Sequence, residues 1–433
     1  MPFQQRRIAS LMSTIKNIIT CELRDSIDSL EDCDVLFFCH DFNRSLNVSG
    51  KAYSPLIDSV KEDLEARGLS CRTIAYPWSS LTGNKADGAP TSFNMAYLRS
   101  RLVNKLAGLV GKNEVSQNNP YIRILKKTNA TLVMTIGSPE ELAFASRETG
   151  AFHVELLHGM GYTSIPWGWN ERSKEHLPRG LLSLDITSTI AFSPLIKKDV
   201  EIYTIPHPFL KKFTLKNFHL QPAEWKLKIN NSSSYLKDIL VSLQWAYAGD
   251  HGPHIQFANI LGNGLFFDEI GDLVKEESDI FWYFRFHPVQ LRSPSYKNLL
   301  RFMDDFVSSH PNSDWREATR VPFPSIAMHC DGNISMSSMS CYDAAAIGVS
   351  SLMLCPNVQT GGIHQDWFRD LQNEGYVTKF EVDKERIRNW VHQTQKKKPR
   401  LSNLEDDSDW EVAVEWMLRK SGLDERIKRR AST

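Results

Sequence analysis

The sequence predicts an α/β protein made of two Rossmann-like domains, and three observations carry this prediction. The chain has 433 residues, which is more than one hydrophobic core usually supports. Short apolar runs alternate with segments of helical periodicity along both halves, as in proteins with parallel sheets. The polar stretch Asn230–Ser234 interrupts this alternation and is typical of a linker. We therefore expect an N-terminal domain at 1–206, a linker region at 207–237, a C-terminal domain at 238–395 and a tail at 396–433.

In the first half, strands are predicted from apolar runs that end at turn residues, and helices from apolar residues spaced three or four apart. Leu56, Val60 and Leu64 have this helical spacing, and Gly68 ends the pattern. The predicted strands are residues 34–40, 71–76, 130–137, 152–157, 190–193 and 202–205. The predicted helices are residues 54–67 and 97–110, with a third that begins near Ser138.

The same alternation restarts after the linker, which is why a second domain of the same kind is expected. The predicted strands are residues 238–243, 280–286, 333–335 and 351–355. The predicted helices are one within 255–275, then 298–308, 342–347, 367–373, 384–395 and 410–420. The last of these belongs to the tail and can pack on either domain. Two such domains place a cleft between the carboxyl ends of two sheets, where α/β proteins bind ligands.

Composition and charge exclude several classes of partner. The formal net charge is zero, so no global field favours nucleic acid, and an anionic ligand needs a local site. The seven cysteines are odd in number and show no zinc or CxxC spacing, which fits a cytoplasmic protein. No run approaches the roughly 18 apolar residues of a membrane span. The N-terminal segment favours an amphipathic helix, which packs either on the protein itself or on the inner face of the cytoplasmic membrane.

The strongest local feature is an apolar strand that ends on Arg285, His287 and Pro288. Proline cannot extend a central strand, so it ends the ladder and places His287 at the carboxyl edge of the sheet. An imidazole there can donate to a phosphate oxygen or protonate a leaving group. The alternative is a histidine at a strand end that bonds only to the backbone.

A serine-rich turn follows the strand that starts at Asn333. Ser337, Ser338 and Ser340 offer hydroxyl groups, and the Ala-rich helix that follows offers N–H groups in its first turn. Together they predict a phosphate site, beside which Asp343 can accept from a sugar or ribose hydroxyl. Helix capping is the alternative, although capping alone needs only one serine.

On the N-terminal side, the strand at 152–157 delivers Glu155 and His158 into a glycine-containing turn. Gly159 and Gly161 permit a positive φ or the close approach of a ligand. We expect Glu155, His158 and Gly159 to face the cleft from the first domain.

The loop after the first strand of the second half contains Gln244 and Asp250. A carboxylate beside an anomeric carbon acts as a nucleophile or a general base, so Asp250 and Glu155 are the catalytic candidates. A lone loop aspartate is otherwise simply solvated. The phosphate loops GxxxxGK[ST] and GxGxxG are absent, which argues against P-loop and simple dinucleotide enzymes.

These features, in this order, resemble the GT-B glycosyltransferases that build bacterial surface polysaccharides. His287-Pro288 followed by Ser337-Ser338 is similar to the HP and SS motifs of enzymes that use CMP-sugars, namely sialyltransferases and Kdo transferases. The resemblance implies that His287 contacts the CMP phosphate or cytidine, and that the two serines bind the phosphate.

Two further segments extend the resemblance, which covers roughly residues 150–360. The segment Glu155-Leu-Leu-His158-Gly159 is similar to a Glu-x-x-His-Gly segment of related polysaccharide enzymes. Retaining β-Kdo transferases carry an essential aspartate upstream of the HP motif, and by position this residue is Asp250. Capsule-type members have a Gln-x-x-Asp/Glu-Asp pattern, whereas Gln244 and Asp250 are six residues apart in this chain.

The resulting prediction is a GT-B glycosyltransferase that needs no metal or cofactor and transfers Kdo from CMP-Kdo with retention. Its acceptor is a bacterial surface glycan or glycolipid, and the inner membrane or a polysaccharide assembly complex are its expected partners. His287, Arg285, Ser337 and Ser338 hold the nucleotide, and Asp250 or Glu155 acts at the anomeric carbon. The alternatives are a sialyltransferase, another UDP- or GDP-sugar transferase, a CDP-polyol phosphotransferase, or an inactive GT-B scaffold.

Overall fold

The computed structural model describes residues 25–109, 118–214, 221–228, 235–244, 260–292, 296–400 and 406–431. The chain forms two compact units. Unit 1 comprises Met1–Phe209 and Asp406–Thr433, and unit 2 comprises Leu210–Glu405. The first unit thus continues past the expected limit at residue 206, and the C-terminal segment returns to it. The expected linker Asn230–Ser234 lies outside the described residues.

Unit 1 is built on a six-stranded sheet in which every pair of neighbouring strands is parallel. The strand order is β4-β1-β5-β6-β7-β8. The strands are β1 Val35–Cys39, β4 Cys71–Ala75, β5 Leu132–Ile136, β6 Phe152–Leu156, β7 Gly180–Ser183 and β8 Glu201–Thr204. Every residue of β1, β5 and β6 is buried, because helices cover both faces of a parallel sheet.

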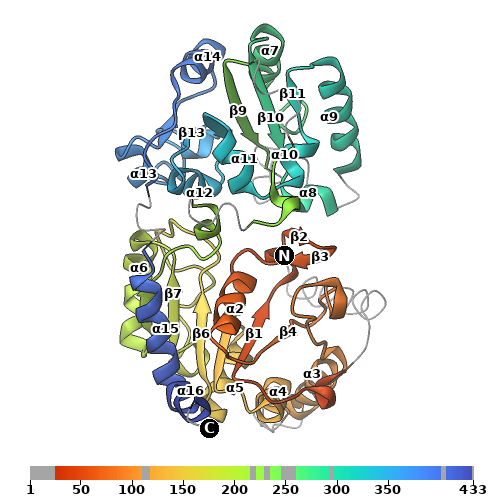
Figure 1. Ribbon diagram of the computed structural model, residues 1–433, viewed down its shortest axis with the longest axis vertical. Coiled ribbons are helices and arrows are strands. Elements are labelled where there is room, and N and C mark those ends of the chain that lie inside the picture. Colours follow the sequence, from red (N-terminus) through yellow and green to blue (C-terminus); the bar gives the residue numbers. More distant parts are fainter. Residues whose placement is uncertain are drawn as a thin grey trace. The chain divides into compact units, whose positions relative to one another are not determined.

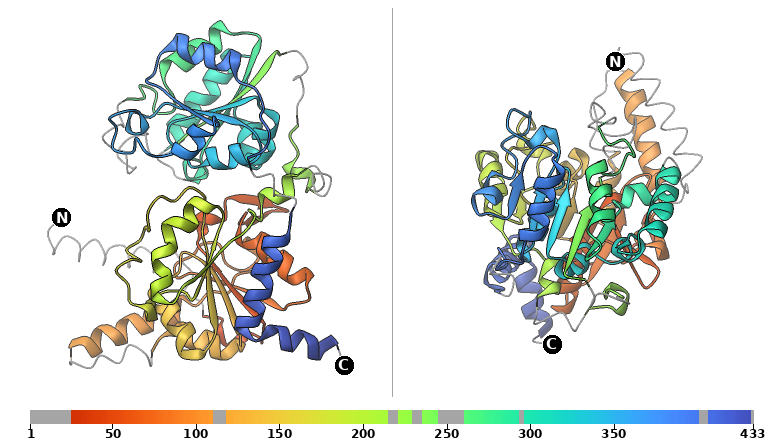
Figure 2. Two further views of the ribbon diagram at one scale, coloured as in Figure 1. Left: turned by 90° about the vertical axis from the view of Figure 1, so that its left-hand side faces the viewer. Right: turned by 90° about the horizontal axis from the view of Figure 1, so that it is seen from above.

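The helices of unit 1 lie around this sheet (Figures 1 and 2). They are α2 Ile57–Ala66, α3 Asn94–Leu109, α4 Pro120–Thr128, α5 Glu140–Thr149, α6 Ile186–Phe192, α15 Ser408–Ser421 and α16 Leu423–Ala431. Helices α4 and α5 pack against alternate strand residues, as Ile124 and Leu142 share one core cluster with Leu36 and Val133. A short antiparallel hairpin, β2 Leu46–Val48 and β3 Lys51–Tyr53, lies outside the main sheet.

Helix α15 brings the end of the chain into the core of unit 1. Trp416 is 1% exposed, and its ring stacks on Tyr203 and meets Phe152 edge-on, with centroids 4.4 and 5.2 Å apart. Gly180 leaves room for the indole, since a Cβ there would lie 2.4 Å from Trp416 Cη2. The indole Nε1 donates to Glu201 Oε2 at 2.9 Å. The predicted tail helix is therefore an integral part of this unit.

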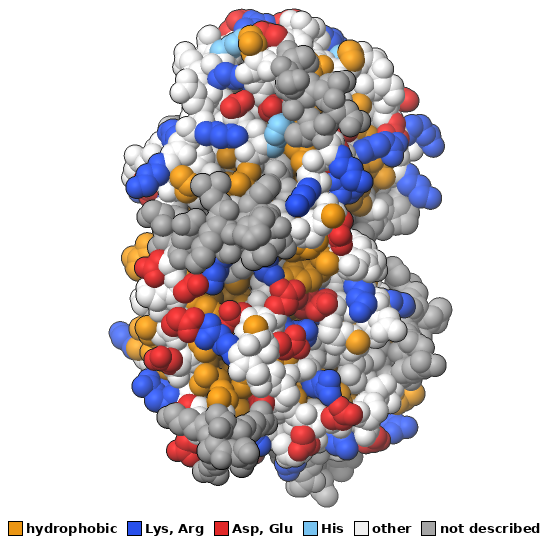
Figure 3. Space-filling view, in the orientation of Figure 1, with side chains coloured by type: hydrophobic (Ala, Val, Ile, Leu, Met, Phe, Trp, Pro, Cys, Tyr) orange, Lys and Arg blue, Asp and Glu red, His pale blue; other side chains and the backbone are white. Residues whose placement is uncertain are grey.

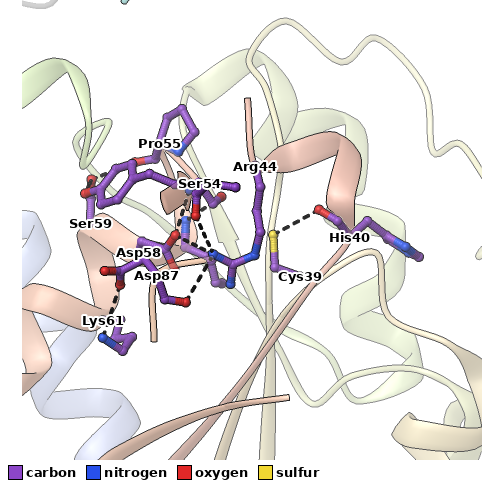
Figure 4. A network of polar contacts seen from close by, with 12 residues as sticks. Cys39, His40, Arg44, Ser54, Pro55, Asp58, Ser59, Lys61 and Asp87 are labelled. Atoms are coloured by element: carbon purple, nitrogen blue, oxygen red, sulfur yellow. Dashed lines mark hydrogen bonds and ion pairs between the residues drawn. The ribbon is translucent and has the colours of Figure 1, made fainter. Parts of the chain in front are cut away.

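A buried ion pair fastens the segment after β1 to helix α2 (Figure 4). Arg44 and Asp58 are 1% and 0% exposed, and Arg44 Nη1 lies 2.8 Å from Asp58 Oδ2. The Ser54 amide donates to the same oxygen at 2.6 Å. Burial raises the pKa of Asp58 to about 6, although the Arg44 charge opposes this shift. Because Arg44 follows His40 closely, the ion pair fixes the path of the chain as it leaves β1.

Unit 2 contains a second six-stranded parallel sheet, with the order β11-β10-β9-β12-β13-β14. Its strands are β9 Lys237–Ser242, β10 Ile280–Arg285, β11 Ser313–Asp314, β12 Gly332–Ser335, β13 Ser350–Met353 and β14 Val377–Lys379. Its helices are α7 Asp268–Glu276, α8 Pro288–Arg292, α9 Lys297–Ser309, α10 Arg316–Arg320, α11 Phe323–His329, α12 Ser340–Ala346, α13 Arg369–Asn373 and α14 Lys384–Gln393. Counted within the unit, the strand order is that of a Rossmann fold, 3-2-1-4-5-6.

The two sheets confirm the predicted fold class, and one predicted strand is wrong. Residues 190–193 do not form a strand, because helix α6 covers Ile186–Phe192. The Asp185 carboxylate accepts the Ser188 amide at 3.0 Å and so caps this helix, which outweighs the strand-like composition of the segment. The strand in this region is β7, which lies between β6 and β8 and was not predicted.

On the face of unit 1 that Figure 3 shows, acidic and basic side chains are interspersed among the described residues. Within the described ranges, no helix has both the length and the apolar character that crossing a bilayer requires.

Trp416→Ala is expected to destabilise the docking of α15 on unit 1 by about 3–5 kcal/mol, the usual cost of truncating a buried aromatic residue. Hydrogen exchange of the amides in β6, β7 and β8 measures this loss as faster exchange. Val412→Ala is the matched control, because Val412 lies on the same helix and is 53% exposed. Equal protection in both variants would contradict the packing role of Trp416.

Candidate functional site

The sheet of unit 2 reverses its direction of growth between β9 and β12. From β9 the chain builds β10 and β11 on one side, and it then returns to build β12, β13 and β14 on the other. Such a switch point opens a crevice at the carboxyl ends of the strands, and ligands of open α/β sheets bind there. Gln244 follows β9 and Ser337 follows β12, and the Ser337 amide donates to Gln244 Oε1 at 2.6 Å. The two predicted binding residues therefore meet at the switch point.

A buried row of polar side chains supports this edge from below. Asn333 is 0% exposed; its Oδ1 accepts from the Ser242 hydroxyl at 2.7 Å, and its Nδ2 donates to Ser351 Oγ at 3.0 Å. The Ser335 hydroxyl donates to Gln244 Oε1 at 3.3 Å. These bonds tie together the ends of β9, β12 and β13. The sequence analysis placed Asn333 only at the start of a strand, and the segment around it, Asp331-Gly-Asn-Ile-Ser335, carries no signal that this amide is buried.

The serine turn closes on itself at the start of α12. Ser338 Oγ accepts from the Ser340 amide at 3.2 Å and from the Ser340 hydroxyl at 2.9 Å. The bond from the Ser340 amide to the side chain two residues earlier is that of a serine turn, so local bonds within the turn before α12 account for these two serines in the structure. Asp343 lies on α12, and burial raises its pKa to about 7. A carboxyl group with this pKa is divided between its charged and neutral forms near neutral pH, so it can accept from or donate to a hydroxyl.

At the end of β10, the backbone of His287 is held by two hydrogen bonds to Gln290. The His287 amide donates to Gln290 Oε1 at 2.9 Å, and the Gln290 amide donates to the His287 carbonyl at 2.8 Å. Pro288 is the first residue of α8, where a proline is favoured. Because β9 lies between β10 and β12, the strands that precede His287 and Ser337 are two strand spacings apart, or about 10 Å.

Arg285 has a structural role beside this histidine. Its Nη1 donates to the carbonyl oxygens of Ala318 and Val321, the latter at 2.6 Å, and so holds the C-terminal end of α10. Burial lowers the pKa of Arg285 to about 10, which leaves it charged at neutral pH. The contact of Arg285 with a nucleotide stays a prediction.

The sheet of unit 1 has its own switch point, between β1 and β5. His40 follows β1 and Gly137 follows β5, and a Cβ at Gly137 would lie 2.7 Å from His40 Cδ2. The imidazole therefore packs directly on the glycine backbone, which has a φ of +86°. The ring also stacks on Tyr76, which follows β4, with centroids 4.2 Å apart. Sequence reasoning missed His40, although it ends an apolar strand as His287 does.

Glu155 lies beneath this edge and holds the turn between β5 and α5. It is 1% exposed; its Oε1 accepts from the Gly137 amide at 2.6 Å, and its Oε2 accepts from the Ser138 amide at 3.1 Å and from the Thr135 hydroxyl. Burial raises the pKa of Glu155 to about 8, although these three donors oppose the shift. The contacts favour a positioning role for Glu155 over the catalytic role that the sequence suggested.

The polar chain below Glu155 continues to His153. Both side chains point to the same face of β6, and Thr135 of β5 lies between them, with its Oγ1 2.9 Å from His153 Nε2. Burial lowers the pKa of His153 to about 3, so the ring is neutral near neutral pH. Because the Thr135 hydroxyl donates to Glu155, His153 Nε2–H donates to Thr135. This order fixes the tautomer of His153 and the orientation of Thr135.

His158 follows β6 at the same edge as His40. The Tyr162 hydroxyl lies 3.1 Å from each imidazole nitrogen, and the Trp167 ring lies 5.4 Å away between centroids. Burial lowers the pKa of His158, and the charge of His40 adds to this effect. A Cβ at Gly159 would meet no atom within 4 Å, so this glycine leaves the space beside His158 open. A neutral imidazole in an open position can accept a proton from a ligand hydroxyl.

The structure thus gathers the predicted residues into two groups, one at the carboxyl edge of each sheet. Asp250 lies outside the described residues. Within the described ranges, His, Cys, Asp and Glu side chains form no group of three or more with the arrangement of a metal site.

Comparisons with known proteins bear on the fold. No known protein family and no curated protein matches the sequence. The solved structure of the wall teichoic acid polymerase TagF is similar over 99% of this chain and 98% of its own, at 12% identity and a TM-score of 0.52. The UDP-GlcNAc 2-epimerase of Neisseria meningitidis bound to UDP-GlcNAc is similar over 89% of this chain and 99% of its own, at 11% identity and a TM-score of 0.50. These likenesses confirm the predicted fold class, two Rossmann-like domains as in GT-B proteins.

Replacing Glu155 by Gln is expected to flatten the pH dependence of stability. The folded-state pKa of about 8 exceeds the ordinary value of 4.5, so the folded wild type binds more protons between these values. Its contribution to the free energy of unfolding therefore falls as pH rises from about 5 to 8, by up to about 1.4 kcal/mol per pH unit. Urea unfolding across this range should show a smaller slope for Glu155→Gln than for wild type. Glu148→Gln, at an exposed position on α5, is the control, and equal slopes in all three proteins would refute the assignment.

Proposed function

We propose that this chain is a nucleotide-sugar-dependent glycosyltransferase that acts on a bacterial surface glycan or glycolipid. The observation that carries the proposal is the Gln244–Ser337 hydrogen bond, because it puts polar groups at the switch point of unit 2. The fold likeness to a wall teichoic acid polymerase and to an epimerase bound to UDP-GlcNAc supports the proposal.

In this proposal, the nucleotide lies across the carboxyl edge of unit 2. His287 donates to a phosphate oxygen on one side of Gln244, and the Ser337 turn lies on the other. The spacing of about 10 Å between the ends of β10 and β12 suits a nucleoside diphosphate, or a nucleoside monophosphate with its sugar. Asp343 holds a ribose or sugar hydroxyl. These fixed donors stabilise the charge of the leaving nucleotide.

The acceptor hydroxyl lies at the carboxyl edge of unit 1. His158 is the proposed general base, since its pKa is lowered and the space beside it is open. Glu155 keeps the Gly137–Ser138 turn in place, and His40 packs on that turn. Asp250 is the proposed nucleophile of a retaining reaction, in which the sugar is first attached to its carboxylate and then passed to the acceptor.

Two donor classes follow from different observations. The HP and SS motifs favour a CMP-sugar, with CMP-Kdo as the first choice. The whole-length fold likeness to a wall teichoic acid polymerase favours the second candidate, a CDP-polyol phosphotransferase that uses the same nucleotide site.

Thermal unfolding with CMP, CDP-glycerol, UDP and GDP distinguishes these donors. A nucleotide at 100 times its Kd stabilises the folded state by about 2.7 kcal/mol and raises the Tm. We expect CMP and CDP-glycerol to raise the Tm and GDP to leave it unchanged. A shift with UDP alone would replace the cytidine donor by a uridine donor, and no shift with any nucleotide would refute the proposed function.

Gln244→Leu is expected to reduce the nucleotide-dependent shift. The leucine has no acceptor for the Ser337 amide, so the turn after β12 loses its fixed position and nucleotide affinity falls about tenfold or more. Gln393→Leu, an exposed glutamine at the end of α14, is the matched control. Titration calorimetry with the nucleotide identified above measures both variants, and equal affinities would show that Gln244 has no part in the site.

A further inference from the structure

A groove with a volume of about 710 Å³ opens on unit 1 beside the turn between β5 and α5. This volume lies in the range of small-molecule sites, roughly 300–1,000 Å³. Three elements supply its walls: the first turns of α5, the start of α4, and the short 3₁₀ helix η4, Lys174–His176.

One part of the wall is apolar and flat. Phe144 of α5 and His176 of η4 are stacked, with centroids 5.9 Å apart and ring planes 22° from parallel. Both side chains are partly exposed, and Pro139 continues the surface. Flat rings of this kind contact the C–H face of a sugar ring well, because they bury apolar area without competing for its hydroxyl groups.

The other part of the wall is polar and preorganised. Arg172 Nε lies 3.1 Å from Glu140 Oε1, and its Nη1 donates to the Ser138 carbonyl at 3.4 Å. Its guanidinium also lies 5.7 Å from the centroid of the Trp169 ring, so three contacts hold it in place. Glu141 adds a second, exposed carboxylate. Carboxylates accept from hydroxyl groups, and a guanidinium donates to ring and hydroxyl oxygens.

The charge of the groove selects between glycan classes. Two carboxylates face one guanidinium, which is already paired with Glu140. A phosphate- or carboxylate-bearing chain would therefore meet net repulsion, whereas an uncharged chain rich in hydroxyl groups finds both donors and acceptors.

The groove adjoins the proposed acceptor position. The Ser138 carbonyl is bonded to Arg172 in the groove, and the Ser138 amide is bonded to Glu155 beneath the edge that carries His40 and His158. From these observations we infer that the groove is a subsite for an uncharged stretch of the acceptor glycan next to the sugar that carries the reacting hydroxyl. This inference rests on the proposed function, which places the reacting hydroxyl of the glycan at the carboxyl edge of unit 1.

Saturation-transfer NMR of the full-length protein with neutral oligosaccharides of two to six N-acetylhexosamine residues tests the subsite. Wild type is expected to bind them, and Phe144→Ala to weaken binding about tenfold or more. Phe144→Leu keeps the buried bulk and removes the flat ring, so it should also weaken binding if the fold is intact. Glu148→Gln on the same helix should bind as wild type does.

Oligosialic acid, as an anionic chain of similar length, is the probe for charge selection and should not bind. Equal binding of the anionic and neutral chains, or equal binding by wild type and both Phe144 variants, would overturn the inference. The nucleotide-dependent Tm shift is measured on the same variants and should be unchanged. Loss of oligosaccharide binding in the Phe144 variants, with a normal nucleotide shift, supports the subsite. Absence of any nucleotide shift in wild type refutes the proposed function. The oligosaccharide result then still tests the groove by itself.

Discussion

Parallel pairing is the constraint from which the rest of this structure follows. Every neighbouring pair in the two six-stranded sheets is parallel, so each connection must cross a face of its sheet before the next strand begins. The crossings bury both faces, and they leave all carboxyl ends at one edge. Side chains from distant parts of the chain, such as Gln244 and Ser337, are thereby brought within hydrogen-bond distance.

At both edges a polar side chain fixes the turn above it, and this side chain is buried in unit 1 and half-buried in unit 2. In unit 1 the Glu155 carboxylate holds two amides of the turn after β5, and in unit 2 the Gln244 amide oxygen holds the turn after β12. An unpaired amide at such a position would cost about 1–3 kcal/mol, so each turn is held strongly in one conformation. The residues of these turns can therefore stay exposed without losing their order.

The sequence predicted most of the fold and the strand-end positions of Gln244, Ser337 and His158, but not the contacts that these residues make. Apolar runs such as Asp34–His40 were sufficient for the central strands, because a strand buried on both faces needs apolar residues at almost every position. Residues 190–193 were assigned to a strand from their composition. The structure forms a helix there because Asp185 caps it, and that hydrogen bond cannot be read from composition. His40 was missed because its neighbour Gly137 is far away in the sequence and close only across the sheet.

The sequence by itself determined the fold class and the carboxyl-edge positions of His287, Ser337 and His158, since strand ends are marked locally by proline, serine and glycine. Only the tertiary structure decided which of these residues meet, because strand order is set by packing across long loops. It also showed that Glu155 is buried and holds the turn after β5, since its burial and its three donors can be seen only after β5 and β6 pair. The physical reason is the same in each case: periodicity is local, whereas hydrogen-bond partners and desolvation are properties of the folded chain.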